Sequence, residues 1–339
     1  MSYLFILGAA PYCDVLAQQA TRTVITGRVM DIETREPLSD VNVYLSFTTI
    51  GTSTDITGAF TILNSPEGVF DLIFSRVGYE RRIIHIKIVS GDSLNCETVL
   101  KPQVLKGAEV EVTAESPREW RENLARFQKA FNGETGNSSQ CSIQNPEVLS
   151  FHFAKDTLVA RADSVLRIDN DALGYRLYVV LKEFVWNTNM DYGHYLIYPF
   201  FQPKPARNGE EQDGWEENRK KTYEGSLKHF LHSLYSASAG AEMFTIFSGS
   251  FKKLARGQGH RVSPNEFSLE PMAGTPFKTM QFQNWLRVNY GIRHDVPSFI
   301  TLRKSYALID SLGNLFDPLS IEVSGKWAKS RIAELLPMH

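Results

Sequence analysis

The sequence predicts a mainly β protein in which an N-terminal antiparallel β-sandwich is followed by an α+β domain. Residues 23–113 show short runs of alternating apolar residues separated by turn residues, and a clear helix start follows at residue 116. The composition favours a folded chain, because 42% apolar and 12% aromatic residues are too many for a solvated coil. At about 150 residues per domain, 339 residues are enough for two domains.

The charge balance argues against partners that are recruited by charge alone. Lys and Arg number 36 and Asp and Glu number 38, which leaves a formal net charge of −2. Such a chain has no electrostatic footprint for nucleic acid, so we expect no nucleic-acid partner. No stretch after the N-terminal run reaches the ~18 unbroken apolar residues of a membrane helix, so we expect no transmembrane helix. Three cysteines are too few for a disulfide scaffold, and pairing of Cys96 with Cys141 stays open.

The first 17 residues are typical of a secretory signal peptide. Tyr3 to Ala10 is a short apolar run, and Val15 and Ala17 occupy the −3 and −1 positions of a cleavage site. We therefore expect residues 1–17 to be removed. The mature chain would then work in the periplasm, at the outer-membrane surface or outside the cell. This region lacks Lys and Arg, and a buried N-terminal strand is the alternative interpretation.

Alternation with a period of two residues marks the strands of the sandwich. Apolar residues occupy every second position over 41–47, 60–62, 70–74 and 84–88. This period places one face of each strand in a core. Turn residues separate the runs at 55–58, 65–68 and 90–92. About seven such strands predict a small antiparallel sandwich over residues 23–113.

Short motifs in this region carry a family resemblance. They are Gly27-Arg28-Val29, Thr34 to Leu38, Val41-Asn42-Val43, Thr54-Asp55 with Gly58 and Phe60, and Gly78-Tyr79. Together they resemble the carboxypeptidase-like regulatory domain, a transthyretin-like sandwich common in secreted and outer-membrane proteins of Bacteroidetes. The resemblance spans residues 23–102 and implies a structural role for these residues, because turns and bends require them.

The resemblance concerns the accessory sandwich of metallocarboxypeptidases and not their zinc module. That module requires the pattern His-x-x-Glu, and no histidine of this chain is followed by glutamate at the third position. The metallocarboxypeptidase catalytic motif is therefore absent. We assign no catalytic, cofactor-binding or metal-ligating residue and expect no cofactor.

The second domain is expected over residues 116–337. A last sandwich strand is predicted over 106–115, and Ser116-Pro117-Arg118-Glu119 then forms a capping box with proline at the first helical position. A meander of strands is predicted over 140–202 and a solvated loop over 203–218. A helix over 223–234, further strands over 277–290 and 299–309, and a closing helix over 327–336 complete the prediction.

The second domain also resembles a block that often follows this sandwich in secreted Bacteroidetes proteins. The matching residues are Cys141-Ser142-Ile143, Leu173-Gly174-Tyr175, Arg219 with Tyr223 to Leu231, and Gly325 to Ala328 with Arg331 to Pro337. The resemblance implies no established chemistry, since no reaction is assigned to that block. The second domain is therefore one of unknown function.

Four weaker patterns in the second domain were weighed as sites. His229 and His232 are three residues apart on a helix, as a metal pair can be, but we expect them on a solvated face or in polar contact with a neighbouring strand. Asp169 to Gly174 has carboxylates and a glycine like a calcium loop, but a strand turn fits better. The two remaining patterns are a basic cluster (Arg219, Lys220, Lys221 and Lys228) and an aromatic run (Tyr192, Tyr195, Tyr198, Phe200 and Phe201). We interpret the basic cluster as a solvated or salt-bridged face, with contact to a phosphate or an acidic partner as the alternative. We interpret the aromatic run as core packing and cross-strand pairs, with stacking on sugars or anchoring of a partner as the alternative.

The sequence thus predicts a non-catalytic secreted or envelope-associated module that binds a protein or glycan partner. The recognisable accessory sandwich motivates this hypothesis, together with the lack of an evident acid, base, nucleophile or metal set. The alternative is a hydrolase whose site forms in the second domain. Its first candidate residues would be His152, Asp163, His229 and His232.

Overall fold

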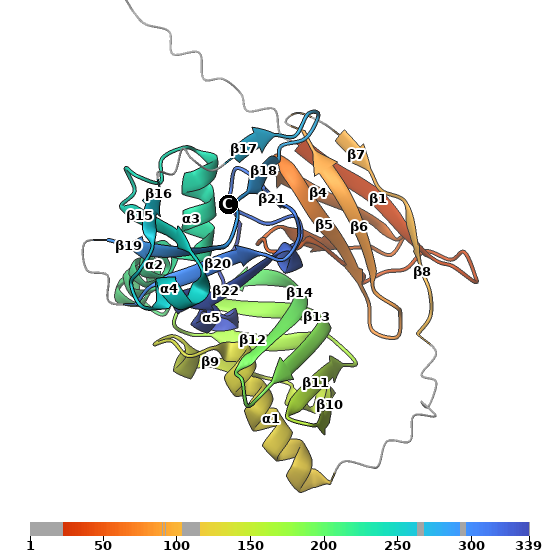
Figure 1. The fold of residues 1–339 in the computed structure, drawn as a ribbon. Helices are drawn as coiled ribbons and strands as arrows, with labels where there is room; N and C mark the ends of the chain where they lie inside the picture. Colours follow the sequence, from red (N-terminus) through yellow and green to blue (C-terminus); the bar gives the residue numbers. More distant parts are fainter. Residues whose placement is uncertain are drawn as a thin grey trace, which may run out of the picture.

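The computed structural model describes residues 23–338 except 90, 92, 104–115, 263–267 and 292–295. The predicted signal peptide (1–17) and the strand predicted over 106–115 therefore lie outside the described residues. Figure 1 shows three groups of elements, which are the N-terminal sandwich, a sheet covered by helix α1, and a C-terminal group of helices and smaller sheets.

The N-terminal sandwich consists of two sheets whose inner faces meet in one core. In the first sheet, β1 lies between β4 on one edge and β7 and β8 on the other. The second sheet has the order β3-β2-β5-β6. The strands are β1 (Thr23–Asp31), β2 (Asn42–Leu45), β3 (Gly51–Ser53), β4 (Ala59–Ser65), β5 (Gly68–Ser75), β6 (Arg82–Ile88), β7 (Ser93–Asn95) and β8 (Thr98–Leu100). The mainly β fold and the sandwich are as predicted, although β7 and β8 run parallel to β1.

The middle group is a six-stranded antiparallel sheet with α1 (Pro117–Asn132) on one face. Its strands are β9 (Cys141–Ile143), β10 (Leu149–Ala154), β11 (Thr157–Ala162), β12 (Leu166–Asn170), β13 (Tyr175–Asn187) and β14 (Tyr192–Pro203). The predicted capping box at Ser116 and Glu119 is present, and the predicted helix and strand meander are confirmed. Phe127 and Phe131 of α1 are fully buried against Phe184 of β13, so α1 and the inner face of the sheet share one core.

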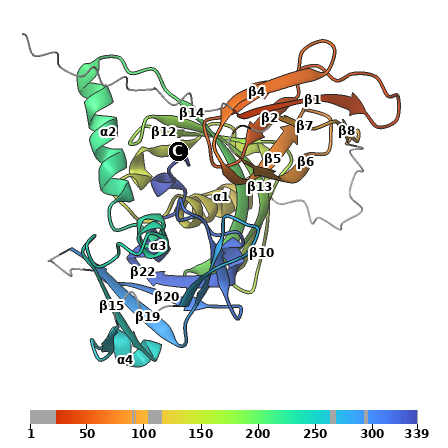
Figure 2. The ribbon, with the colours of Figure 1, turned by 90° about the horizontal axis from the view of Figure 1, so that it is seen from above.

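The C-terminal group has a five-stranded sheet of order β16-β15-β19-β20-β22 and a three-stranded sheet of order β17-β18-β21. The strands are β15 (Phe244–Gly249), β16 (His260–Val262), β17 (Ser268–Pro271), β18 (Lys278–Gln281), β19 (Trp285–Tyr290), β20 (Ser298–Leu302), β21 (Ala307–Ile309) and β22 (Ile321–Gly325). The helices are α2 (Gly209–Tyr223), α3 (Leu227–Tyr235), α4 (Phe251–Ala255) and α5 (Lys326–Lys329). Figure 2 shows α2 and α3 following one another along one side of the molecule. Residues 116–338 therefore contain two hydrophobic cores, one around α1 and one around α3.

One loop prediction and one helix prediction are wrong in part. Residues 209–218 of the solvated loop predicted over 203–218 form the start of α2, which Asn208 caps at its N-terminus. The closing helix predicted over 327–336 is only α5 and a short 3-10 turn (Ile332–Glu334). The chain leaves the helical conformation here because Ser330 pairs with Gly133, and the carbonyl of Lys329 accepts from the amide of Glu134.

The sandwich packs against the outer face of the six-stranded sheet, opposite α1. Tyr44 and Ile73 of the sandwich form a buried cluster with Val180 of β13. The predicted strand alternation fails at Phe47, where a positive φ of 63° begins a turn. The turn is stabilised because the amide of Phe47 donates to the carbonyl of Pro199 at 2.7 Å, along the edge of β14.

Candidate functional site

The four candidate residues of the hydrolase hypothesis lie apart in the structure. His152 is exposed on β10, and Asp163 is exposed in the turn after β11. His229 and His232 are on α3, which belongs to the other core. Within the described ranges, no group of three or more His, Cys, Asp or Glu side chains is arranged to hold a metal ion.

Of the two environments expected for His229, the solvated face is wrong, and the side chain instead makes buried polar contacts. Its side chain is 6% exposed and lies among the rings of Tyr223, Phe244 and Tyr290. The amide of Gly225 donates to Nδ1 at 3.0 Å, so Nε2 carries the hydrogen and donates to Glu242 Oε2 at 2.6 Å. Because both ring nitrogens are engaged, His229 has a structural role and no free nitrogen for a reacting group.

Glu242 completes this buried cluster. Burial alone would raise the pKa of its carboxyl, but hydrogen bonds from Ser238 and His229 and the nearby imidazoles lower it overall. His232, in contrast, is partly exposed, and its Nδ1 lies 2.7 Å from the carbonyl of Ser311. The two histidines therefore have separate partners and do not form a metal pair.

The residues from Asp169 to Gly174 form a strand turn, as the sequence favours. Helix α2 covers this turn with side chains spaced three and four residues apart. Trp215 Nε1 donates to the carbonyl of Asp171 at 2.8 Å, and Arg219 Nε donates to that of Leu173 at 2.8 Å. The guanidinium of Arg219 also lies 4.2 Å from the ring centre of Tyr175. Arg219 is therefore a structural residue, which separates it from the basic cluster expected on a solvated face.

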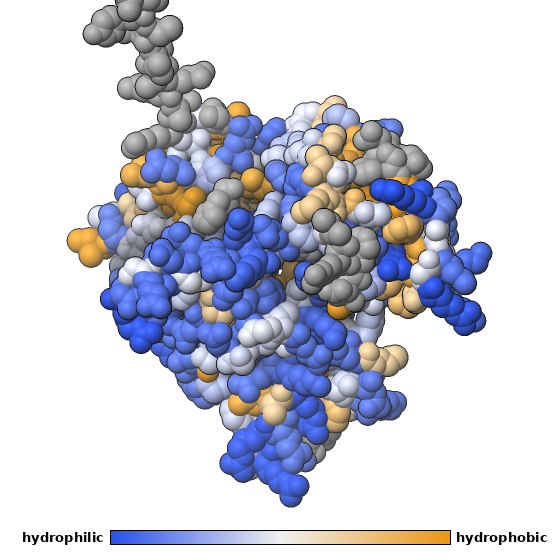
Figure 3. Space-filling view, turned by 90° about the vertical axis from the view of Figure 1, so that its left-hand side faces the viewer, coloured by the Kyte–Doolittle hydropathy of each residue, from blue (hydrophilic) through white to orange (hydrophobic). Residues whose placement is uncertain are grey.

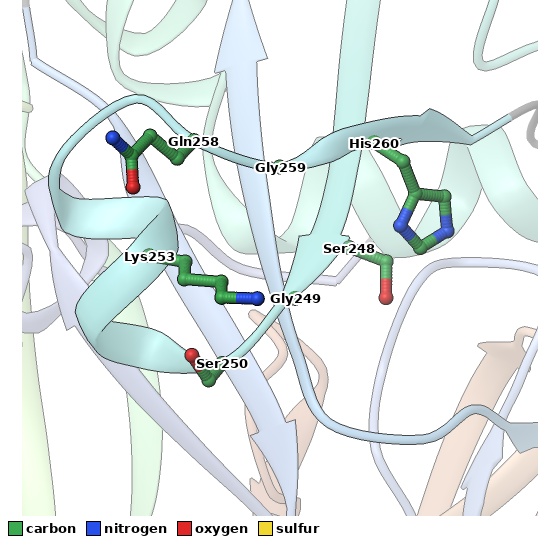
Figure 4. A pocket seen from close by; sticks show the side chains of 7 residues that line it. All are labelled: Ser248, Gly249, Ser250, Lys253, Gln258, Gly259 and His260. Carbon is green, nitrogen blue, oxygen red and sulfur yellow. The ribbon is translucent and has the colours of Figure 1, made fainter.

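The C-terminal group contains a shallow depression of about 540 Å³ at the start of α4. It is lined by Ser248, Gly249, Ser250, Lys253, Gln258, Gly259 and His260. Figure 4 shows Lys253 reaching toward Gly249, whereas Gln258 points away and His260 lies on the far side of Ser248. The polar groups do not converge on one point, so this arrangement defines no reaction centre.

The strongest candidate site is the part of the outer sheet face that the sandwich leaves uncovered. The sandwich covers β13 at Val180, whereas Lys182 and Glu183 are exposed on the same strand. We call the uncovered part the open face. It consists of Ser150, His152, Val159, Arg161, Lys182, Glu183, Val185, Tyr192, His194 and Leu196, which are all exposed or partly exposed.

Strand register aligns four of these side chains in one row. His152 of β10 is paired with Val159 of β11, Val159 with Val185 of β13, and Val185 with His194 of β14. Directly paired residues share a face, and neighbouring strands are about 4.8 Å apart, so the row extends over about 14 Å. The row therefore places two imidazoles at its ends, on strands held in fixed register.

A β-bulge adds charged groups beside this row. The register shifts between Leu181 and Glu183, so that Lys182 and Glu183 are both exposed while Leu181 and Phe184 are buried. Bulges commonly redirect a side chain in this way. Glu183 Oε1 lies 3.0 Å from His194 Nε2. The bulge thus exposes the ammonium of Lys182 and the carboxylate of Glu183, and the carboxylate already contacts His194.

Among the residues of the open face, two cations, Arg161 and Lys182, face one carboxylate, Glu183. Arg161 and Lys182 make no ion pair or side-chain hydrogen bond within the part of the chain that the structure describes. Arg303, which follows β20, donates from Nη1 to the hydroxyl of Tyr192 at 3.2 Å. In the sequence, Tyr192 belongs to an aromatic run, whereas Arg161, Lys182 and Arg303 belong to no recognisable pattern. Strand pairing across distant segments is what brings them together.

The rest of the aromatic run packs as predicted. Phe201 is fully buried in the core, and the ring of Tyr195 lies 5.3 Å from that of Phe131. Tyr198 and Phe200 pack against the cluster under the sandwich. Only Tyr192, at 42% exposed, remains available to a partner.

The two cysteines outside the predicted signal peptide are free thiols. Cys141 is buried and Cys96 partly buried. Burial is the main reason why the pKa of Cys141 is raised to about 12, so its thiol is not a nucleophile at neutral pH. Among the described residues, no helix is long and apolar enough to cross a membrane.

Comparison with known protein families finds a match for the N-terminal sandwich. The model described as CarboxypepD_reg-like domain matches residues 25–112, about a quarter of the chain. The match confirms the resemblance to the carboxypeptidase-like regulatory domain. A search among curated proteins finds no match.

Solved structures show only distant likeness. A type II cohesin–X-dockerin complex from Acetivibrio cellulolyticus is 21% identical over 23% of this chain and 56% of that chain, with a TM-score of 0.20. A putative carbohydrate-binding protein from Bacteroides uniformis is 8% identical over 47% and 60%, with a TM-score of 0.17. The major pilin subunit of Bacillus cereus is 12% identical over 89% and 95%, with a TM-score of 0.19. Scores this low describe local likeness and define no shared overall fold.

Proposed function

We infer that this protein is a non-catalytic, exported module that binds a protein or glycan partner on the open face. The observation that carries the inference is the row from His152 to His194, in which exposed side chains are held in fixed register on a sheet with a packed opposite face. A partner that meets preorganised groups loses less ordering entropy on binding. A rigid sheet is therefore a suitable recognition surface.

The arrangement supports binding better than hydrolysis. A hydrolase needs a base within hydrogen-bond reach of a nucleophile or a water. Both ring nitrogens of the buried His229 are engaged in hydrogen bonds. His152 and Asp163 lie in the middle group of elements, whereas α3 belongs to the C-terminal group. The open face, in contrast, presents free cations and ring faces on one surface.

A retention experiment with the purified protein tests this function. Immobilised protein is incubated with envelope extract, in parallel with the double variant Arg161→Glu and Lys182→Glu. The matched control carries Lys220→Glu and Lys252→Glu, which make the same charge change on α2 and α4. We expect a retained component that is lost with the open-face variant and kept with the control. Equal retention by all three proteins would exclude the open face as the binding site.

We further propose that residues 1–17 are removed during export. The apolar run and the small residues before Gln18 support this proposal. Intact-mass measurement of the native protein is expected to give a chain that begins at Gln18. A mass that includes Met1 would contradict it.

A further inference from the structure

We propose that the partner of the open face is an acidic polysaccharide, a chain of sugar rings that bear carboxylates. This proposal rests on the proposed function and names the chemical class of its ligand. The argument uses the charge of the open face, the ring faces on it and its elongated shape.

The charge of the open face favours an anionic ligand. Arg161 and Lys182 are exposed and make no ion pair or side-chain hydrogen bond with other described residues, while the side chain of Arg303 donates to the hydroxyl of Tyr192. A guanidinium presents a planar fork that matches a carboxylate in two parallel hydrogen bonds. Glu183 is the one carboxylate among the open-face residues, and it is engaged by His194. Positive groups are therefore left for a ligand to neutralise.

The rings and the shape of the open face favour sugars over an acidic peptide. The side chains of Tyr192, His152 and His194 are planar rings that also carry polar groups. Such a ring can lie against the face of a sugar ring. Protein interfaces instead centre on apolar anchors in desolvated pockets. The apolar members of the row, Val159 and Val185, are partly buried and offer no such anchor. A row about 14 Å long suits a polymer better than a single small molecule.

The space-filling view agrees with a mostly polar surface elsewhere. On the side shown in Figure 3, hydrophilic side chains predominate over the lower part, and apolar ones gather in small areas above.

The test measures affinity for defined polymers at 0.1 M salt. The purified protein is titrated with polygalacturonate, neutral dextran and poly-glutamate. We expect polygalacturonate to bind at least tenfold more tightly than dextran, because dextran has no carboxylates for Arg161 and Lys182 to engage. We also expect it to bind at least tenfold more tightly than poly-glutamate, because poly-glutamate has no sugar rings to lie against the planar side chains of the open face. Equal affinity for dextran, or equal affinity for poly-glutamate, would overturn the proposal.

Two variants and one control locate the site. Arg161→Glu with Lys182→Glu is expected to weaken polygalacturonate binding at least tenfold, and Tyr192→Ala, which changes no charge, is expected to weaken it severalfold. Lys220→Glu with Lys252→Glu should change it less than twofold. An equal loss with this control would mean unspecific attraction and would overturn the proposal. Thermal melts check that these surface variants remain folded.

The outcomes separate this proposal from the proposed function. If the open-face variant loses a component of envelope extract but polygalacturonate does not bind, only the ligand class is wrong. If neither experiment depends on the open face, both are wrong.

Discussion

Lys228 is a half-buried cation between α3 and the C-terminal segment. Its ammonium donates to the carbonyl of Pro337 at 3.3 Å. Burial lowers the pKa of this ammonium to about 8, although the carboxylate of Asp310 partly offsets the effect. The folded protein therefore holds the charged form of this lysine at a cost in stability at neutral pH.

Replacing this lysine is expected to stabilise the protein at pH 7. Between pH 8 and the ordinary lysine value of 10.5, the unfolded chain binds more protons than the folded one, so the free energy of unfolding rises with pH. Below pH 8 both states are protonated and the cost is fully present. Lys228→Met should therefore gain about 2 kcal/mol at pH 7, and the gain should shrink toward pH 10. Urea unfolding of both proteins at the two pH values measures this difference.

Comparison of the unchanged protein with Lys228→Met isolates the contribution of this lysine to the pH dependence of stability. Other groups, such as the buried thiol of Cys141, contribute the same pH dependence to both, and their contribution cancels in the difference. A difference that stays constant from pH 7 to 10 would contradict the explanation.

Arg331 is a second buried cation with a structural role. It is 6% exposed, lies 4.3 Å from the ring centre of Trp186, and donates to the carbonyls of Ala130 and Ala328 at 2.9 Å. Arg331→Met would leave the buried carbonyl of Ala130 and the partly buried carbonyl of Ala328 without this donor, so we expect a loss of about 2–3 kcal/mol in the free energy of unfolding. Chemical denaturation measures it.

The ion pair of Arg331 provides the control. Asp191 Oδ2 is 3.1 Å from the guanidinium, but the side chain of Asp191 is 52% exposed. Solvent screens such a pair, so Asp191→Asn should cost less than about 1 kcal/mol. If the two variants cost the same, the ion pair and not the carbonyl contacts would explain the stability.

At the scale of elements, α2 shows how a helix can form with little apolar signal. Trp215 is its only buried residue among those described, and Gly209 and Gly214 disfavour a helix. The helix is stabilised instead by the cap at Asn208, by an ion pair between Lys221 and Glu217, and by the contacts to the turn before β13. A pattern of apolar residues could not have predicted it.

The contact between α2 and that turn has a steric requirement at Gly174. Its φ is +67°, and a Cβ there would lie 2.2 Å from the Trp215 ring. Trp215→Ala is expected to cost about 3–5 kcal/mol through the cavity and the lost hydrogen bond. Hydrogen exchange should then show lower protection in the turn and in α2.

A control variant at the exposed Glu216 and a milder variant at Asn218 complete this experiment. Glu216→Ala, on the solvent side of α2, should leave exchange in the turn unchanged. If Trp215→Ala does not fold, Asn218→Ala, which removes a hydrogen bond to the carbonyl of Ala172, should cost about 1 kcal/mol. Unchanged hydrogen-exchange protection of the turn in Trp215→Ala and Asn218→Ala would contradict the stabilising role given to α2.

At the scale of the whole molecule, the contact between the sandwich and the middle sheet limits the open face. Ile73 is fully buried although it points out of the sandwich, because Val180 and Tyr44 cover it. Ile73→Glu would bury a charge in this contact, which costs several kcal/mol. We expect the sandwich to separate from the rest, with a larger radius of gyration and two thermal transitions.

A variant on the exposed edge of the sandwich is the control. Leu63→Glu changes a residue of β4 that is 59% exposed and lies away from this contact. This variant should keep a single thermal transition and the radius of gyration of the unchanged protein. A single transition for Ile73→Glu as well would show that the two parts do not depend on this contact.

The sequence predicted those features that depend on neighbours along the chain. The capping box at Ser116, the strand meander and the sandwich strands all follow from local spacing, and the structure has them. The burial of His229 could not be predicted, because angular position on one helix does not reveal whether a second layer covers the polar side. Phe47 was misplaced because the alternation continues into a turn that β14 holds.

By itself, the sequence determined that the chain is mainly β, that its N-terminal part is a carboxypeptidase-like regulatory sandwich and that the peptidase motif is absent. Strand and turn patterns are local, so they can be read from one chain. Only the tertiary structure decided which side chains share the open face. His152, Arg161, Lys182 and Tyr192 come from four strands, and their alignment depends on register and on a bulge. Pairing between distant strands sets both, and no local spacing encodes them.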